Sequence, residues 1–202
     1  MALAMLGAFS GCSNTGDGAS PSGGSDSDTI RIGGPAPLTG EAASYGVAVN
    51  NGIQMAVEDI NANGGIDGKQ IKYIYYDEKG DTTEATNAYN KLVQDDKVVA
   101  IIGDVTTKPT LAVAQTSQQD NIPIITATAT AAEVTLTGPN IFRACFTDPF
   151  QGELMASYAS EKLGATKVAV LSDMADDYSS GIAEAFVAKA EELGMQVVAD
   201  EK

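Results

Sequence analysis

Two short apolar runs of this chain each lead into a group of threonines, whose hydroxyl groups are well placed to bind a ligand. The runs are 98–102 and 122–125. Continuous β-branched runs of this length are typical of strands buried on both faces of a parallel sheet. The threonines that follow are Thr106, Thr107 and Thr110 after the first run, and Thr126, Thr128 and Thr130 after the second. Ligands of open α/β sheets bind beyond the carboxyl ends of the strands. The pattern therefore predicts hydrogen bonding to a small polar ligand rather than acid–base chemistry.

The residues after Thr106 open a helix, because Leu111, Ala114 and Gln118 recur at helical spacing. Proline suits the first turn of a helix, where Lys108-Pro109 stands. The unpaired N–H groups of a helix amino terminus bind carboxylates without a basic side chain. A second interpretation remains open, in which Thr106 or Thr107 only caps the helix.

Composition excludes several classes of function. The formal charge is −15, from 27 acidic and 12 basic residues, which argues against binding nucleic acid, whose phosphates need a basic surface. The chain has no histidine, the commonest general base and metal ligand, and its two cysteines fit no zinc spacing. It also has no glycine-rich phosphate loop and no nucleophile elbow. We therefore expect no enzyme, no metal site and no cofactor.

The first 29 residues indicate export and anchoring. Residues 1–12 are small and apolar and end at Cys12, and the run is too short for a span, which takes ~20 residues. Phe9-Ser10-Gly11-Cys12 resembles the lipobox of bacterial lipoproteins, in which the cysteine carries lipid. Residues 13–29, rich in Ser, Gly and Asp, are typical of a flexible tether. We expect an extracytoplasmic protein held on the membrane by a lipid on Cys12.

Strand and helix patterns then alternate, which predicts βαβ units, a parallel sheet and an α/β fold. Predicted strands cover 30–34, 71–76, 98–102, 122–125, 140–143, 167–172 and 195–199. Predicted helices cover 46–61, 82–95, the segment after Thr107, 150–163 and 178–193. A break at Thr147-Asp148-Pro149 separates a first lobe, 30–146, from the beginning of a second lobe, 147–202.

Short motifs from about Ile30 to Lys202 make the chain resemble the solute-binding proteins of branched-chain amino acid ABC transporters, the leucine/isoleucine/valine-binding family. The motifs are Pro37-Leu38-Thr39-Gly40, Tyr45-Gly46, 56–61 with Gly64-Gly65-Ile66, Ile102-Gly103, 122–125 into Thr128-Ala129-Thr130, Phe142-Arg143, Asp148-Pro149 with Gln151-Gly152, and Asp177-Tyr178. The resemblance implies a two-lobed type I periplasmic-binding-protein fold of parallel sheets flanked by helices. Because full members are longer, it implies a nearly complete first lobe and a partial second lobe.

The resemblance also implies roles for single residues. Thr107 stands where a hydroxyl and a backbone N–H bind the ligand's α-carboxylate, and Thr130 where a threonine holds both carboxylate and ammonium. Thr128 stands where a backbone carbonyl accepts from that ammonium. Tyr45 and Tyr178 match aromatic residues offered to the ligand by the first and second lobes. The predicted ligand-binding set is Tyr45, Thr106, Thr107, Thr128, Ala129, Thr130, Asp148 and Tyr178.

Plainer explanations stay open for several of these residues. Tyr45, predicted in a loop, can be an ordinary surface tyrosine, and Tyr178 can pack as part of its helix. Asp148 can shape the Asp-Pro turn instead of binding an ammonium. Thr128 and Thr130 can belong to a hydroxyl-rich turn.

Two functions follow from the resemblance. The first is capture of an amino acid, branched-chain or otherwise aliphatic, for delivery to the permease of an ABC transporter. The alternative is the ligand-binding sensory domain of a receptor or amide regulator with the same fold. Both imply a small-molecule ligand, no nucleic acid and no cofactor.

Overall fold

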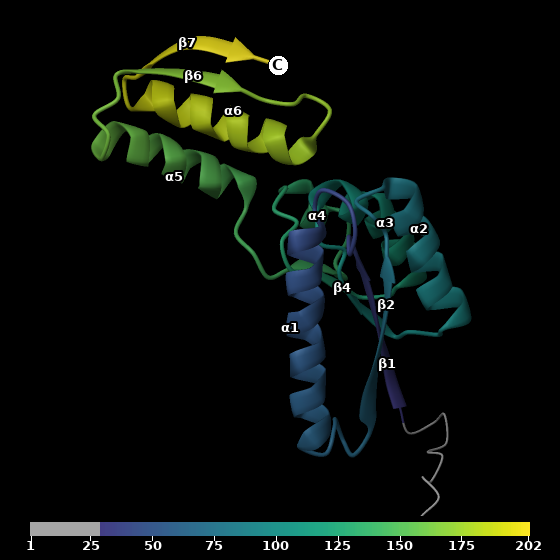
Figure 1. The fold of residues 1–202 in the computed structure, drawn as a ribbon. Helices are drawn as coiled ribbons and strands as arrows, with labels where there is room; N and C mark the ends of the chain where they lie inside the picture. The colour runs from purple at the N-terminus through teal and green to yellow at the C-terminus, as the bar shows by residue number, and fades with distance from the viewer. Residues whose placement is uncertain (1–28) are drawn as a thin grey trace, which may run out of the picture.

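The computed structural model describes residues 29–202, so Cys12 and almost all of the 13–29 tether lie outside the described residues. The chain forms two α/β units joined near Asp148 (Figure 1). Among the described residues no helix is both long and apolar enough to cross a membrane.

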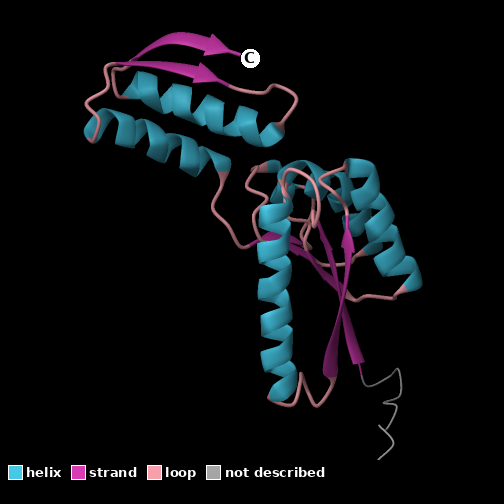
Figure 2. Cartoon of the chain, in the orientation of Figure 1, coloured by secondary structure: helices cyan, strands magenta, loops and turns pink. Residues whose placement is uncertain are grey.

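The first unit is a five-stranded parallel sheet in the order β2-β1-β3-β4-β5. Its strands are β1 (Thr29–Ala36), β2 (Gln70–Asp77), β3 (Ala100–Ile102), β4 (Ile124–Thr126) and β5 (Ile141–Arg143). Its helices are α1 (Ala43–Ala62), α2 (Thr82–Asn90), which continues as the π-helix η2 (Lys91–Asp95), α3 (Thr107–Asp120) and the short α4 (Glu133–Leu136). Helix α1 covers one face of β1 and β2, and α2 and α3 pack side by side on the other face (Figures 1 and 2).

The main core lies between the sheet and the pair α2 and α3. Tyr89, Leu92, Ile101, Val113 and Ile124 are all buried there. The opposite face is covered only in part, since Ile125 and Phe142, which pair across β4 and β5, remain exposed.

Local chemistry explains where the helices begin and end. The side chain of Asp81 accepts hydrogen bonds from the N–H groups of Thr83 and Glu84 and so caps α2. Helix α3 ends at Asn121, whose φ of 56° is a left-handed value that asparagine tolerates. Because β2 and β3 both pair in parallel with β1, the loops that follow them lie at the same edge of the sheet.

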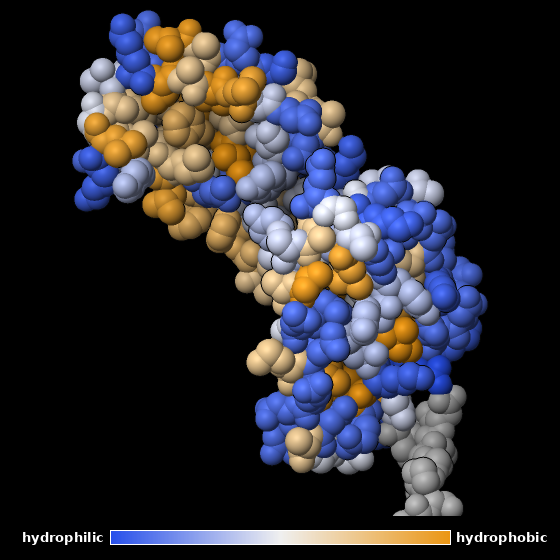
Figure 3. Space-filling view, in the orientation of Figure 1, coloured by the Kyte–Doolittle hydropathy of each residue, from blue (hydrophilic) through white to orange (hydrophobic). Residues whose placement is uncertain are grey.

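The second unit contains α5 (Asp148–Glu161), β6 (Lys167–Leu171), α6 (Asp177–Glu192) and β7 (Gln196–Glu201). Its two strands pair in parallel. Helices α5 and α6 lie against each other, and Gly152 permits this approach: a Cβ there would stand 2.5 Å from the carbonyl oxygen of Ile182. The surface of this unit exposes large apolar side chains, including Phe150, Leu154 and Tyr158 (Figure 3).

The sequence predicted these elements to within a few residues, with three differences. The predicted helix 82–95 changes to π geometry at Lys91, and α4 was missed because it is only four residues long. Tyr45 was predicted in a loop, which is wrong: α1 begins at Ala43, so Tyr45 lies in its first turn. The apolar stripe does not extend to this start, because the first turn of the helix packs little of its side-chain surface.

Candidate ligand-binding site

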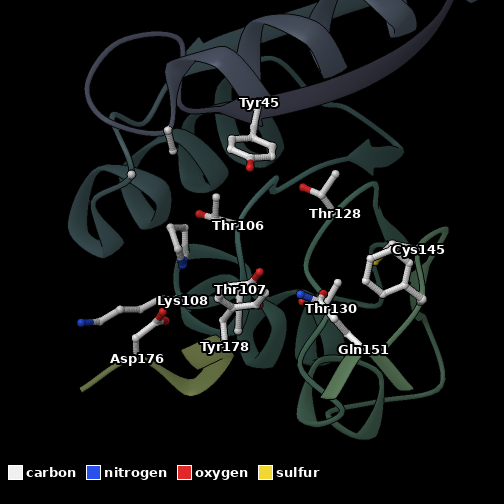
Figure 4. A pocket seen from close by; sticks show the side chains of 14 residues that line it. Tyr45, Thr106, Thr107, Lys108, Thr128, Thr130, Cys145, Gln151, Asp176 and Tyr178 are labelled. Carbon is white, nitrogen blue, oxygen red and sulfur yellow. The ribbon is translucent and has the colours of Figure 1, made fainter. Parts of the chain in front are cut away.

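A cavity of about 560 Å³ lies where the carboxyl ends of the first sheet meet the second unit (Figure 4). This volume is within the ~300–1,000 Å³ range of small-molecule sites. Its wall comprises Ala42, Tyr45, Gly80, Thr106, Thr107, Lys108, Pro109, Thr128, Thr130, Cys145, Phe146, Gln151, Asp176 and Tyr178. Both units contribute to it, and hydroxyl groups and aromatic rings dominate it.

The amino terminus of α3 forms one wall. Thr106 precedes the helix in an extended conformation, and Thr107 is its first residue. Thr106 occupies the capping position, yet its side chain makes no capping hydrogen bond. The first N–H groups of a helix have no acceptor within the helix, so those of Thr107 and Lys108 are available at this wall. The missing N–H of Pro109 costs nothing there.

The loop after β4 forms the adjoining wall and is tied to the loop after β3. The hydroxyl of Thr126 donates to the carbonyl oxygen of Asp104, and that of Thr128 donates to the carbonyl oxygen of Val105. Because the Thr128 hydroxyl is engaged inside the protein, this residue offers a ligand its backbone. Thr130 differs: its hydroxyl oxygen is buried and lies near the Asp148 carboxylate, but the two form no hydrogen bond of normal geometry.

Arg143 holds this second loop in place from behind. Its guanidinium donates to the carbonyl oxygens of Thr130 at 3.0 Å and Ala131 at 2.6 Å, and to that of Ala132 at 3.2 Å. It also donates to the hydroxyl of Thr135 at 2.7 Å. A planar fork with five donors suits several acceptors at once. The resemblance pointed to Phe142-Arg143 only as a landmark, and this contact with the binding loop was missed.

Two residues of the predicted set do not line the cavity. Ala129 is fully buried in the core of the first unit. Asp148 is the first residue of α5 and is also buried, with its carboxylate against Gly181 of α6. Burial raises the pKa of Asp148, while the Thr130 hydroxyl and the charge of Arg143 act in the opposite direction. Asp148 therefore lies behind Thr130 rather than at the cavity wall.

The two tyrosines lie at opposite sides of the cavity. Tyr45 extends from α1 in the first unit and Tyr178 from the first turn of α6 in the second (Figure 4). They are 62% and 40% exposed, so neither is a core residue in this structure. Among the described residues the structure thus brings Tyr45, Thr106, Thr107, Thr128, Thr130 and Tyr178 of the predicted set to one cavity.

The predicted set did not include the other polar residues of the wall. Lys108, Gln151 and Asp176 all line the cavity, and Cys145 does so with a half-buried free thiol. Burial raises the pKa of this thiol, whose sulfur lies 3.5 Å from the carbonyl oxygen of Ala129. Only a resemblance could have placed Asp176 at the same cavity as Thr107, because they lie in different units. In the part of the chain that the structure describes, no acidic, cysteine or histidine cluster is suited to a metal ion.

A hydroxyl-lined cavity between two parallel α/β units, with the amino terminus of a helix in its wall, is typical of a two-lobed solute-binding protein. A sequence profile described as periplasmic binding protein matches residues 29–202, and the chain belongs to that family. The prediction of a parallel α/β fold of this type is confirmed.

Three relatives show how similar the chain is to known proteins. It is 36% identical over 170 residues to Leu/Ile/Val-binding protein homolog 3 of Brucella melitensis, covering 84% of this chain and 46% of the relative. The structure of the branched-chain amino acid transporter substrate binding protein LivJ from Streptococcus pneumoniae, in complex with isoleucine, matches with a TM-score of 0.81 and 40% identity, over 86% of this chain and 49% of that one. A solute binding protein of an ABC transporter from Rhodopseudomonas palustris, in complex with 3,4-dihydroxybenzoic acid, matches with a TM-score of 0.79 and 27% identity, over 87% and 47%. The chain therefore spans about half the length of these relatives.

Proposed function

We propose that the complete protein captures a free amino acid with an aliphatic side chain, outside the cell membrane, and delivers it to the permease of an ABC transporter. The observation that carries this proposal is that the amino terminus of α3 and the hydroxyl of Thr130 lie at the same cavity. The open amino terminus of α3 suits a carboxylate, and the unpartnered hydroxyl of Thr130 suits the charged groups beside it. The named ligands of the relatives support the same class of ligand.

In this proposal the backbone N–H and the hydroxyl of Thr107 bind the α-carboxylate. The Thr130 hydroxyl and the Thr128 carbonyl bind the α-ammonium, and the buried charge of Asp148 favours that cation from behind Thr130. Tyr45 and Tyr178 contact the ligand's side chain from the two lobes. The site has no catalytic role, in keeping with relatives that are named as binding proteins.

A second candidate ligand is an aromatic carboxylic acid. The Rhodopseudomonas palustris relative holds 3,4-dihydroxybenzoic acid, and three aromatic rings, those of Tyr45, Phe146 and Tyr178, line the cavity here. Such a ligand has the carboxylate but lacks the ammonium. An amino acid therefore needs the Thr130 hydroxyl as an acceptor for its ammonium, whereas an aromatic acid does not.

Calorimetric titration of the complete protein separates these candidates. The ligands are leucine and isoleucine, leucinamide without a carboxylate, 4-methylpentanoate without an ammonium, and 3,4-dihydroxybenzoate. A hydrogen bond to a charged group contributes ~1.5–3 kcal/mol, so each altered analogue should bind roughly ten- to a hundredfold more weakly than leucine. Tight binding of 3,4-dihydroxybenzoate together with no binding of leucine would replace the amino acid by the aromatic acid.

We also propose that a lipid on Cys12 anchors the mature protein to the outer side of the cell membrane. The support is the order of segments in the sequence: an apolar leader, Cys12, then a Ser/Gly-rich tether. Mass spectrometry of the amino terminus of protein purified from bacterial membranes should find an acylated Cys12. Exported protein that retains residues 1–11 would contradict the anchor without affecting the proposed ligand.

A further inference from the structure

The half-buried carboxylate of Asp77 ties together two loops beside the ligand cavity. Asp77 is the last residue of β2 and pairs with Ala36, the last residue of β1. Its Oδ1 atom accepts hydrogen bonds from the N–H groups of Leu38 at 2.9 Å and Thr39 at 3.2 Å, in the loop after β1. Oδ1 also accepts from the N–H group of Lys79 at 3.0 Å, in the loop after β2, and Oδ2 accepts from the Thr39 hydroxyl at 2.5 Å. Four donors thus converge on one side chain, just beyond the point where the two strands end.

These bonds favour the ionised form of Asp77. Burial by itself raises the pKa of Asp77, but hydrogen bonds, first from the Thr39 hydroxyl and then from backbone N–H groups, outweigh it and lower the pKa overall. An ionised carboxylate only accepts hydrogen bonds, which matches the four donors around it. Hydrogen bonds to a charged group are also stronger than those between neutral groups. The Asp77 carboxylate is therefore well suited to hold the two loops together.

The loop after β1 leads directly into the first turn of α1, which contains Tyr45. Helix α1 has no capping side chain of its own, since Ala42 stands at the capping position. Gly46 lies against the loop, because a Cβ on it would stand 2.1 Å from the carbonyl oxygen of Pro37. Ala42 and Tyr45 both line the cavity. The position of Tyr45 at the cavity therefore depends on the position of the loop, residues 37–42.

Asp77 is the main tie on this loop. Among the described residues, every side-chain hydrogen bond that involves residues 37–42 is made with Asp77. Gly40 comes close to the second loop, since a Cβ on it would stand 3.2 Å from the carbonyl oxygen of Lys79. The second loop contains Gly80, which also lines the cavity. The two loops therefore form one connected part of the cavity wall.

We propose that Asp77 is a positioning residue for ligand binding, whose carboxylate holds the 37–42 loop, and with it Tyr45, at the cavity. Tyr45 is one of the two residues proposed to contact the ligand's side chain. Asp77 therefore influences which aliphatic side chain the site prefers, without touching the ligand. This effect on ligand preference rests on the proposed function, whereas the effect on the motion of the loop does not.

The test is a double-mutant cycle in the complete protein, with Asp77→Ala, Tyr45→Ala and the double variant, titrated calorimetrically with leucine, isoleucine and valine. Asp77→Ala should weaken binding roughly four- to tenfold, as expected when one of the two tyrosines that cover an aliphatic side chain is displaced. It should also change the ranking of the three ligands in the same direction as Tyr45→Ala. In the protein that already lacks the Tyr45 ring, Asp77→Ala should weaken binding by less than about twofold, because no ring remains to be positioned.

A second measurement needs no ligand. Hydrogen exchange of ligand-free protein, followed by mass spectrometry of the peptide 37–46, reports directly on the loop and the first turn of α1. Exchange of this peptide should become roughly tenfold faster in Asp77→Ala, because the loop loses its tie.

The matched control is Asp81→Ala, which removes another carboxylate from the same region of the chain. Asp81 accepts hydrogen bonds from two N–H groups of α2 and from none in the 37–42 loop. The control should lower stability in urea, and it should leave the ligand ranking and the exchange of peptide 37–46 unchanged.

The outcomes separate this inference from the proposed function. Equal losses of affinity on Asp77→Ala with and without the Tyr45 ring would overturn the positioning role, even if the substitution lowers stability. If none of the three amino acids binds to the native protein, the proposed function fails, and the exchange measurement decides: faster exchange of peptide 37–46 supports the tie and unchanged exchange overturns it. Should Asp77→Ala fail to fold, Thr39→Val removes one of the four donors and should produce the same changes to a smaller extent. Native ranking and native exchange in Thr39→Val would then count against the proposal.

Discussion

Replacement of Arg143 by alanine should weaken both the fold and the site. Its guanidinium contacts the loop that contains Thr130, a residue proposed to bind the ligand. Three of its acceptors keep another donor: the Asp148 N–H also bonds to Thr130 O, the Val134 N–H to Ala131 O and the Cys145 thiol to Ala129 O. The net loss is then the bonds to Ala132 O and the Thr135 hydroxyl.

At ~1.5–3 kcal/mol for each hydrogen bond to a charged group, these two bonds amount to about 3–6 kcal/mol. Partial exposure of Arg143 places the expected loss of unfolding free energy near ~3 kcal/mol. Arg143→Lys should cost less, because an ammonium keeps the charge but lacks the planar fork. A displaced Thr130 should weaken isoleucine binding roughly tenfold, about 1.4 kcal/mol.

The assay combines urea unfolding with calorimetric titration of the complete protein. The matched control is Arg31→Ala, which removes the chain's other arginine: Arg31 donates to the carbonyl oxygen of Asp96 at 2.8 Å, away from the cavity. The control should lose stability and keep its affinity. If Arg143→Ala also keeps its affinity while losing stability, Arg143 supports the fold alone and does not position the binding loop.

Three further predictions concern other parts of the molecule. Thr107→Ala should reduce affinity for leucine, isoleucine and valine alike by roughly ten- to a hundredfold, and Thr107→Ser should reduce it far less. A fall in melting temperature with every affinity intact would show that Thr107 is only a structural residue. Tyr45→Ala should change the ranking among these three amino acids, measured by titration, and an unchanged ranking would remove Tyr45 from the side-chain pocket. Gly152→Ala should lower the free energy of unfolding, measured in urea, by ~1–3 kcal/mol, because its Cβ would stand 2.5 Å from the carbonyl oxygen of Ile182. The control Gly52→Ala, in open space on α1, should raise it by ~0.5–1 kcal/mol. Equal effects of the two substitutions would refute the close helix contact.

The amino-acid sequence by itself determined the order and type of almost every element. Apolar residues that recur every 3.6 positions or in short β-branched runs report which face of a segment is buried, and this information is local. The run at 122–125 therefore predicted β4, and the stripe at 46–61 predicted α1. Tyr45 was misplaced because a helix start with little buried surface leaves no periodic signal.

The threonines of the site were also accessible from the sequence. Thr107, Thr128 and Thr130 follow apolar runs, and parallel strands bring their carboxyl ends to one edge of a sheet. The resemblance to a known family then indicated a ligand for them. Ala129 and Asp148 were drawn into the set by their position in the same motifs, but the packing that buries them depends on distant residues such as Gly181.

Only the tertiary structure decided the contacts between segments far apart in the chain. Glu78 follows β2 and Asp104 follows β3, and the packing around these two strand ends buries both carboxyl groups completely. Likewise, Arg143 at the end of β5 donates hydrogen bonds to carbonyl groups of the loop after β4. A lone acidic residue or arginine in a sequence is most often solvated at the surface. Whether it is buried, and which groups then satisfy its charge, is set by the packing of elements that no local pattern describes.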